Sequence, residues 1–385
     1  MYFLCRMRGR RQPQRELTYL IDLESMVGPK HPIREVKRMC EEVLKEMDPL
    51  FNEMYSEYGR MSIPPERLLM SWVLMALFSV RSCRLFAEQL KYNMLFKWFL
   101  DMNPDEIQFD ASTFSKNMER FQKHRVSETF FIEVVHLADR HKWISHEHFS
   151  VDGTLIESWA SMKSFRPNDE EAPPPGKGRN GWEDFKDQKR SNDTHTSTTD
   201  PESKLVRKSK GKEAKLSFRG HSVIENRNGL LVHFTVRSAV GEDSTEAEVA
   251  DGQLDEITER GLNPKTVGGD KGYHTKEFVK NCRDKGTVPH VAEQKGRKTP
   301  GLDKRTTRSE AYKTSQRIRK RVEEPFGWMK TVGLFRKSRW IGVERTDFVG
   351  QFIAASCNLI RMAKLTKTNT SDPPCIGSAA TPSAV

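Results

Sequence analysis

Residues 317–330 read Arg-Ile-Arg-Lys-Arg-Val-Glu-Glu-Pro-Phe-Gly-Trp-Met-Lys. At helical period, Arg319, Glu323 and Lys330 follow one another at steps of four and seven, which return a side chain to nearly the same angle around the helix axis. The stretch therefore predicts a helix with one acid between two bases on a single face. A solvated helix with intrahelical ion pairs would give the same pattern, with each pair contributing only about 0.2–0.5 kcal/mol.

Two aspartates elsewhere in the chain stand beside short apolar or β-branched segments. Asp152 lies in Phe-Ser-Val-Asp-Gly-Thr, and Asp270 lies in Thr-Val-Gly-Gly-Asp-Lys-Gly-Tyr. Each segment predicts a buried strand, and glycine close to the acid leaves room beside the backbone. Three carboxylates delivered by two strands and one helix make a hard-oxygen site, which suits Mg²⁺ or Mn²⁺.

These motifs resemble those of the DDE transposases of bacterial insertion sequences, in particular the group named after insertion sequence five. In that group, the helix that carries the third catalytic acid has the motif Tyr-x₂-Arg-x₃-Glu-x₆-Lys. The corresponding positions here are Gln316, Arg319, Glu323 and Lys330. Three of these match and Gln316 departs. The Asp-Gly-Thr at Asp152 and the Asp-Lys-Gly-Tyr at Asp270 also match, and the resemblance spans residues 22–365.

The resemblance implies metal-dependent phosphoryl transfer. Asp152 is expected to bridge two divalent ions, Mg²⁺ or Mn²⁺, about 3.5–4 Å apart, with Asp270 and Glu323 completing the separate metal sites. Water would attack the end of the element, and the freed 3′-hydroxyl would then attack target DNA. Arg319 and Lys330 would bind phosphates near the cut. Further cations expected to contact DNA are Lys271, Arg317, Lys320, Lys116, Arg120, Lys123, Arg207 and Lys208.

The predicted function is therefore a transposase that binds the terminal inverted repeats of its insertion sequence. Its partner would be double-stranded DNA, both the element ends and the target. Since two ends must be joined, we expect a homodimer or a higher oligomer on DNA. Two alternatives remain: a metal-dependent DNA nuclease of the same fold without strand transfer, and a catalytically impaired copy that only binds DNA. The presence of all three acids disfavours the impaired copy.

The distribution of charge supports a polyanionic partner. The 385 residues carry a net charge of +11, and 30% of them are charged against 36% hydrophobic. Residues 295–339 alone hold fifteen Lys or Arg and four Asp or Glu, an excess equal to that of the whole chain. A basic segment around one carboxylate is suited to bring phosphates to that carboxylate. A solvated basic face is the alternative interpretation.

Cysteine spacing and hydropathy bear on the compartment. The six cysteines form no Cys-x-x-Cys pair, which argues against a disulfide framework and a structural zinc site and favours a reducing compartment. No run of eighteen apolar residues occurs, and we see no secretory signal, so we expect no contact with a membrane. The predicted location is the bacterial cytoplasm, in association with the nucleoid.

The periodicity predicts an α+β chain whose pattern changes from helical to extended near Phe149. The order strand, strand, strand, helix, strand, helix is that of a ribonuclease-H-like α/β domain, and Asn228-Gly229 predicts a tight hairpin within it. A helix beginning near Asp110 carries Lys116, Arg120 and Lys123 on a basic face. The expected divisions are a flexible basic arm (1–20), a helical DNA-binding domain (21–143), a catalytic domain (144–365) with an irregular insertion (161–215), and a disordered tail (366–385).

Several residues compete with this assignment. Glu324 is the nearest rival for the third acid, about 100° around the helix from Glu323. Glu157 follows Asp152 at odd spacing, which predicts the opposite face of the strand. His146 and His148 are two residues apart, so on a strand they would share a face and could bind a transition metal. Such a pair is more often part of a polar surface. Pro325 would kink or restart the helix, and we expect a kink that leaves Glu323 directed inward.

Overall fold

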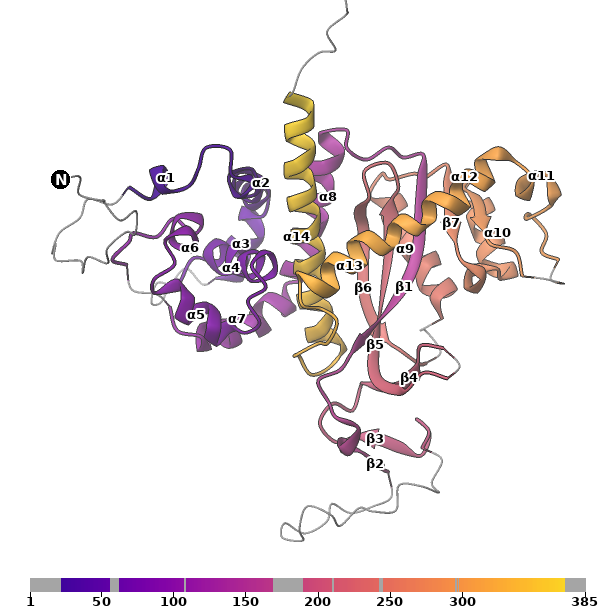
Figure 1. The fold of residues 1–385 in the computed structure, drawn as a ribbon, viewed down its shortest axis with the longest axis horizontal. Coiled ribbons are helices and arrows are strands. Elements are labelled where there is room, and N and C mark those ends of the chain that lie inside the picture. Colours follow the sequence, from indigo (N-terminus) through magenta and orange to yellow (C-terminus); the bar gives the residue numbers. More distant parts are fainter. Residues whose placement is uncertain are drawn as a thin grey trace, which may run out of the picture.

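The computed structural model describes residues 22–55, 62–106, 109–168, 190–209, 211–241, 245–294, 296 and 298–370. A helical N-terminal part lies on one side of the long C-terminal helix, and a mixed sheet lies on the other (Figure 1). The predicted arm, residues 1–20, lies outside the described residues, as do residues 371–385. Among the described residues, no helix is both long enough and apolar enough to cross a membrane.

The N-terminal part consists of helices, two of which begin at residues typical of helix starts. Pro32 is the first residue of its helix, and the Ser82 hydroxyl accepts a hydrogen bond from the Leu85 N–H at the start of another. The helices are α1 (Leu23–Met26), α2 (Pro32–Glu46), α3 (Asp48–Met54), α4 (Pro65–Leu77), α5 (Cys83–Leu90), α6 (Met94–Phe99), α7 (Ser112–Lys123) and α8 (Val126–Arg140).

A six-stranded sheet follows. Its strands are β1 (His148–Glu157), β4 (Lys204–Arg207), β5 (Ala214–Glu225), β6 (Leu230–Ser238), β7 (Thr266–Gly269) and β8 (Val288–Val291). β4 and β6 pair with successive parts of β5, and the order then runs β5-β1-β7-β8. β1 pairs antiparallel with β5 and parallel with β7, which pairs parallel with β8. The carboxyl end of β7 therefore lies beside the middle of β1.

Helices cover this sheet and connect its strands. They are α9 (Glu246–Glu259), α10 (Lys276–Asp284), α11 (Lys304–Thr307), α12 (Glu310–Ile318), α13 (Glu323–Thr331) and α14 (Val343–Thr370), with 3₁₀ turns η1 (Met162–Ser164), η3 (Lys271–Tyr273) and η4 (Arg319–Val322). α9 packs against β5, β6 and β1, and α14 packs against β6, α8, α4 and α2. α14 is thus the element shared by the N-terminal helices and the sheet.

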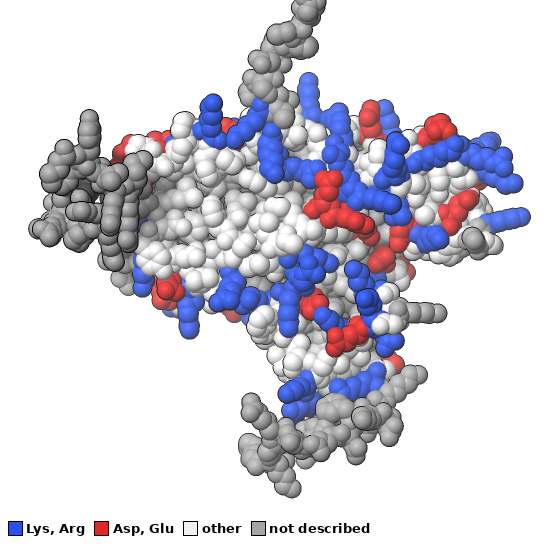
Figure 2. Space-filling model, viewed as in Figure 1, with Lys and Arg blue, Asp and Glu red and all other residues white. Residues whose placement is uncertain are grey.

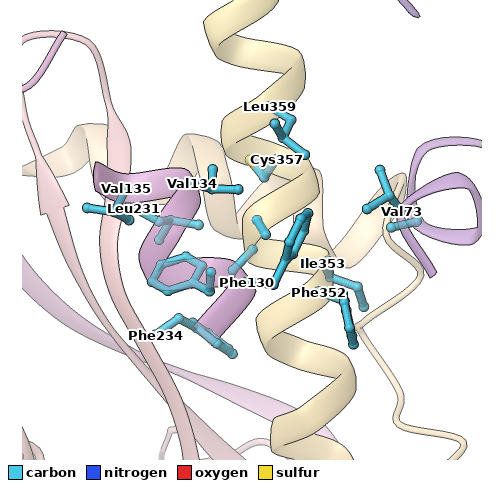
Figure 3. Packing of buried hydrophobic residues seen from close by; sticks show 14 of the residues in the cluster. Val73, Phe130, Val134, Val135, Leu231, Phe234, Phe352, Ile353, Cys357 and Leu359 are labelled. Atoms are coloured by element: carbon cyan, nitrogen blue, oxygen red, sulfur yellow. The ribbon is translucent and has the colours of Figure 1, made fainter. Parts of the chain in front are cut away.

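One continuous hydrophobic core runs through both parts (Figure 3). Phe352 of α14 stacks on Trp72 of α4, with ring centroids 6.0 Å apart, and also contacts Phe130 of α8. Gly350 brings α14 close to the sheet, because a Cβ there would lie 2.7 Å from the Phe234 ring of β6. The aromatic contacts of α14 fix the sheet relative to the N-terminal helices.

The end of α14 corrects the predicted tail. The sequence analysis predicted a disordered tail over residues 366–385, but the helix continues to Thr370. The prediction of disorder is wrong for residues 366–370. Elongating a helix that is already packed costs little even for polar residues, and the Lys367 ammonium donates to the Lys30 carbonyl at 2.7 Å.

The predicted irregular insertion, residues 161–215, also contains regular structure. Its described part includes η1, the small antiparallel pair β2 (Phe165–Pro167) and β3 (His195–Ser197), β4, and the first residues of β5. Asn192 anchors it by exchanging two hydrogen bonds with the Leu205 backbone. Strands of three or four residues depend on distant partners and show no usable period, so the prediction missed them.

The hairpin between β5 and β6 was predicted correctly, but its turn was not. Glu225 pairs with Leu230, so the loop has four residues. Gly229 has φ +69°, whereas Asn228 has no positive φ, and a two-residue primed turn of type I′ requires positive φ at both positions. Gly229 is needed for space as well, because the Arg361 guanidinium lies 2.6 Å from the position a Cβ would take.

Candidate active site

The pairing of two parallel strands brings Asp152 and Asp270 together. Ser150 of β1 is paired with Gly268 of β7, and the same register two residues later places Asp152 beside Asp270. Asp152 accepts a hydrogen bond from the Gly153 N–H at 2.8 Å. Asp270 follows β7 directly and accepts from the Gly272 N–H at 2.6 Å, which closes the turn η3. Both carboxylates are therefore held by the backbone beside a glycine.

Burial raises the pKa of Asp152 to about 6. The hydrogen bond from Gly153 opposes this shift, whereas the nearby carboxylates of Asp270 and Glu246 raise the pKa further. The same carboxylates and that of Asp152 add to the effect of burial in raising the pKa of the Tyr273 phenol. Three acids therefore interact where the end of β7 meets the middle of β1, and one of them, Glu246, was not a predicted site residue.

Glu323 is the first residue of α13, and the break in the third-acid helix lies before it. The predicted single helix is divided into α12, the 3₁₀ turn η4 over Arg319–Val322, and α13. The predicted position of the kink, at Pro325, is therefore wrong. Pro325 falls in the first turn of α13, where a missing N–H leaves no intrahelical hydrogen bond unmade. Glu323 was expected to be directed inward, but its side chain is exposed; it lines the same open cleft as Asp152 and Asp270.

That cleft has a volume of about 910 Å³ and a wall of mixed charge. Its acids are Asp152, Glu157, Glu213, Glu246, Asp270 and Glu323. Its cations are Arg207, Lys208, Lys212, Lys215, Arg219, Lys330 and Arg336. Figure 2 shows Lys and Arg interleaved with Asp and Glu over the half of this face that carries the sheet and α13. The cleft thus offers both carboxylate oxygens and phosphate-binding cations.

Two basic residues of the third-acid segment are held in place by neighbouring side chains. The Lys330 ammonium donates a hydrogen bond to the Thr154 hydroxyl on β1, and burial together with Lys208 and Arg336 lowers the pKa of Lys330. Arg319 donates to the Gln316 side chain at 3.1 Å. Gln316, which departs from the expected tyrosine, also donates to the His290 carbonyl of β8. The glutamine therefore ties the Arg319 side chain to the sheet.

Two family models match the chain. Residues 185–359 match the Transposase DDE domain, and residues 21–120 match the Transposase domain (DUF772). The chain belongs to the DDE transposases of insertion sequences. The DDE match contains Asp270 and Glu323, and Asp152 lies before its first residue. A DDE domain implies a ribonuclease-H-like fold, which agrees with the strand order β6-β5-β1-β7-β8.

Solved structures similar to this transposase resemble it weakly. A piggyBac transposase synaptic complex with hairpin DNA is 8% identical, with a TM-score of 0.40 over 88% of this chain and 76% of that chain. A Mos1 transposase paired-end complex is 11% identical, with a TM-score of 0.19 over 82% of this chain and 100% of that chain. No curated protein matches the transposase significantly.

The predicted DNA contacts divide into two groups in the transposase. Arg207 and Lys208, at the end of β4, line the cleft together with Lys330. The remaining predicted cations are outside the wall of the cleft: Arg319, Lys271, Arg317, Lys320, Lys116, Arg120 and Lys123. The last three are exposed on α7, on the helical side of the molecule, where the Arg120 guanidinium lies 4.6 Å from the centre of the Tyr55 ring.

The rivals for the third acid have other partners. Glu324 accepts from Arg361 at 2.9 Å and lies 3.6 Å from Arg321. Glu157 pairs with Lys215 at 2.9 Å and also lines the cleft, whose wall includes residues from both faces of β1. The Glu324 carboxylate is therefore paired with Arg361 of α14.

The histidine pair does not form a shared site. His146 lies 2.8 Å from Asp139, whereas the His148 ring bonds the Thr266 hydroxyl at 2.6 Å, and the strand begins only at His148. Across the described ranges, no three His, Cys, Asp or Glu side chains lie close enough together to hold one metal ion. Asp152, Asp270 and Glu323 thus share a cleft without converging on one point.

Sequence reasoning missed Glu246 and Arg219 as residues of the site. An acid in the first turn of a helix is favoured by the helix dipole, so the position of Glu246 in the sequence does not by itself indicate a site. Arg219, on β5, pairs with it at 3.0 Å. The available signal was the order of elements, since a helix that returns over β1 can bring its first residue near the part of β1 that carries Asp152.

Proposed function

We propose that this transposase binds the terminal inverted repeats of its insertion sequence, cleaves the DNA ends and transfers the 3′-OH ends to target DNA. One observation carries the proposal. A single cleft has Asp152, Asp270 and Glu323 in its wall, although 118 and 53 residues separate them along the chain. The spacing of Arg319, Glu323 and Lys330 supports assignment to the insertion sequence five group.

The donor set of the cleft fits a hard divalent cation. Asp152, Asp270 and Glu323 offer only carboxylate oxygens, which Mg²⁺ and Mn²⁺ prefer over nitrogen or sulfur. Asp152, in the middle of β1, and Asp270, directly after β7, repel each other, and a bound cation would offset that repulsion. When bound, two divalent ions would supply activation of the attacking oxygen and stabilisation of the leaving oxygen.

The cations of the cleft would hold the DNA backbone. One of these cations, Lys330, lies on α13, and two, Arg207 and Lys208, lie at the end of β4. A DNA backbone lying along the cleft would therefore meet basic side chains from both sides. Arg319, tied to Gln316, lowers the pKa of Asp152 by its charge and would meet a phosphate close to that carboxylate. This arrangement orients the phosphodiester for attack by water first and by the freed 3′-hydroxyl second.

The assembly and the wider DNA contacts belong to the same proposal. Lys116, Arg120 and Lys123 on α7 would bind the element end outside the catalytic cleft, as the resemblance implies. Lys271, Arg317 and Lys320 are exposed around the third-acid segment and would bind flanking phosphates. Because two element ends must be joined, we propose a homodimer or higher oligomer on DNA. The DNA would be that of the bacterial nucleoid.

The test uses the full-length protein, Mg²⁺, DNA carrying the repeats that flank its own gene, and a second labelled duplex. The variants are Asp152→Asn and, as a matched control, Asp284→Asn, which changes an exposed aspartate at the end of α10. We expect the wild type and the control to cut the repeat end and join it to the second duplex, and Asp152→Asn to bind without cutting.

Each other outcome rejects the proposal in a distinct way. Cutting without joining, lost with Asp152→Asn, would indicate a nuclease of the same fold. Binding by all forms with no cutting would indicate an impaired copy. Cutting by wild type and Asp152→Asn alike would remove Asp152 from the site.

A further inference from the structure

The connection between α13 and α14, residues 332–342, runs beside the end of β1 (Figure 1). The Glu157 N–H donates to the Arg336 carbonyl at 3.0 Å, and the Ser338 N–H donates to the Glu157 carbonyl at 2.7 Å. Glu157 and Lys337 form a parallel bridge, so the connection is fixed to the last residue of β1. Glu157 and Arg336 also line the candidate active-site cleft. The connection therefore meets β1 at the wall of that cleft.

Trp159 follows two residues beyond Glu157 and is exposed, with 49% of its surface accessible. The backbone before it is held on both sides. The Ser158 N–H donates to the Leu216 carbonyl at 2.8 Å, and the Ser158 hydroxyl donates to Asp200 at 2.7 Å. A single exposed aromatic side chain is common on protein surfaces, so its surroundings decide whether it has a role.

Two cations of the connection lie against this ring. Lys337 Nζ is 5.0 Å and the guanidinium carbon of Arg339 is 4.7 Å from the centre of the Trp159 ring, which are distances of cation–π contacts. Both side chains are exposed, and among the residues that the structure describes neither forms an ion pair with a carboxylate. Residues 332–342 contain three cations and no acid. The positive charge at this ring is therefore not offset by the connection itself.

A purely structural role accounts for part of this arrangement. A cation–π contact explains why one basic side chain would cover an exposed tryptophan. It does not explain why two of them gather at one ring, because like charges repel each other. A phosphate group would offset that repulsion, and it would meet two donors whose positions the ring fixes in advance. The arrangement thus has the charge and the preorganisation that a DNA backbone requires.

We propose that Trp159, Lys337 and Arg339 form a phosphate-binding surface that continues the path of the DNA out of the cleft. The inference rests on the proposed function and adds a contact to the same duplex. Lys337 and Arg339 bind the phosphates, and Trp159 is a positioning residue that holds both cations. Trp159 is seven residues beyond Asp152, at most about 23 Å of extended chain. The surface therefore meets the duplex within about seven base pairs of the cut phosphate.

The test measures how tightly the full-length protein binds DNA carrying the repeats that flank its own gene. Fluorescence anisotropy is recorded across a salt series with a chelator present, so that no DNA is cut. We expect Lys337→Ala and Arg339→Ala each to weaken binding several-fold and to lower the slope of log K against log salt concentration by about one. Lys45→Ala, which removes an exposed lysine near the end of α2, is the matched control and should change neither quantity.

Substitutions of Trp159 separate positioning of the cations from direct contact with DNA. Trp159→Leu should weaken binding, whereas Trp159→Phe keeps an aromatic face for the cations and should bind nearly as the wild type does. In a protein that carries both Lys337→Ala and Arg339→Ala, adding Trp159→Leu should have no further effect. A further loss of affinity there would mean that the ring itself contacts the DNA, which contradicts the positioning role.

Trimmed duplexes locate the contact. With only about three base pairs left on one side of the cut, wild type and Lys337→Ala should bind equally for one of the two sides. A difference that persists on both trimmed duplexes would contradict the proposed distance from the cut.

Lys330→Ala distinguishes failure of this inference from failure of the proposed function. Weaker binding by Lys330→Ala, with wild-type binding by Lys337→Ala and Arg339→Ala, would overturn the inference alone. Unchanged binding by all three variants would overturn the proposed DNA path through the cleft as well.

Discussion

Lys330 on α13 donates a hydrogen bond to Thr154 on β1, a residue 176 positions earlier in the chain. Thr154 lies two residues beyond Asp152, and alternate residues of a strand share a face. The bond therefore holds the helix that begins with Glu323 against the strand that carries the first acid. It also places an ammonium group in the cleft before any DNA is bound.

We predict that Lys330→Ala weakens binding of the element end and lowers the salt dependence. Losing one phosphate contact reduces the slope of log K against log salt concentration by about one. Fluorescence anisotropy across a salt series measures both quantities. Lys313→Ala, which removes an exposed lysine of α12 paired with Glu310, is the control. An unchanged slope for Lys330→Ala would show that this ammonium does not contact a phosphate.

Glu323 and Glu324 are adjacent and are expected to differ in effect. Glu323→Gln should abolish DNA cleavage with little change in folding, since its side chain is exposed in the cleft. Glu324→Gln should retain cleavage and lower the free energy of unfolding by less than about 1 kcal/mol, because its pair with Arg361 is half exposed. Cleavage assays and urea denaturation of both variants test these expectations. Loss of cleavage in Glu324→Gln alone would identify Glu324, and not Glu323, as the third acid.

The pKa of Asp152, raised to about 6, makes stability depend on pH in the metal-free protein. Between about pH 4 and pH 6 the folded chain binds this proton more tightly than the unfolded chain, so the free energy of unfolding falls as pH rises through that window. Asp152→Asn carries no such charge and should be more stable than wild type by about 1–2 kcal/mol at neutral pH.

The measurement is urea denaturation with a chelator present. The difference between Asp152→Asn and wild type should disappear near pH 4, and Asp284→Asn should show no such pH dependence. An Asp152→Asn protein less stable than wild type at neutral pH would contradict a burial cost at this carboxylate.

Two glycines in helices are expected to respond oppositely to alanine. Gly350→Ala would press a methyl group against the Phe234 and Phe335 rings, at 2.7 and 3.0 Å, and should lower the free energy of unfolding by about 1–3 kcal/mol. In α9, a Cβ at Gly252 would have no neighbouring atom within 4 Å, so Gly252→Ala should raise the free energy of unfolding by about 0.5–1 kcal/mol. Calorimetry compares the two, and stabilisation by both would mean that α14 packs less closely on the sheet.

Local sequence patterns were sufficient for the elements of the site. The runs around Asp152 and Asp270 predicted strands, and the spacing of Arg319, Glu323 and Lys330 predicted a helical segment. These patterns depend on neighbours within a few residues, which the chain encodes directly. The cation-rich segment could be located by the same means.

Contacts between distant residues decided the remainder. The break at η4, the length of α14 and the commitment of Glu324 to Arg361 follow from packing partners elsewhere in the chain. Glu246 entered the site only because α9 folds back over β1 and two glycines leave room for its carboxylate. The sequence by itself determined the longer strands and helices around the site and three of its candidate acids. Tertiary structure alone decided which of those acids share a cleft, because that depends on the register and packing of segments far apart in the chain.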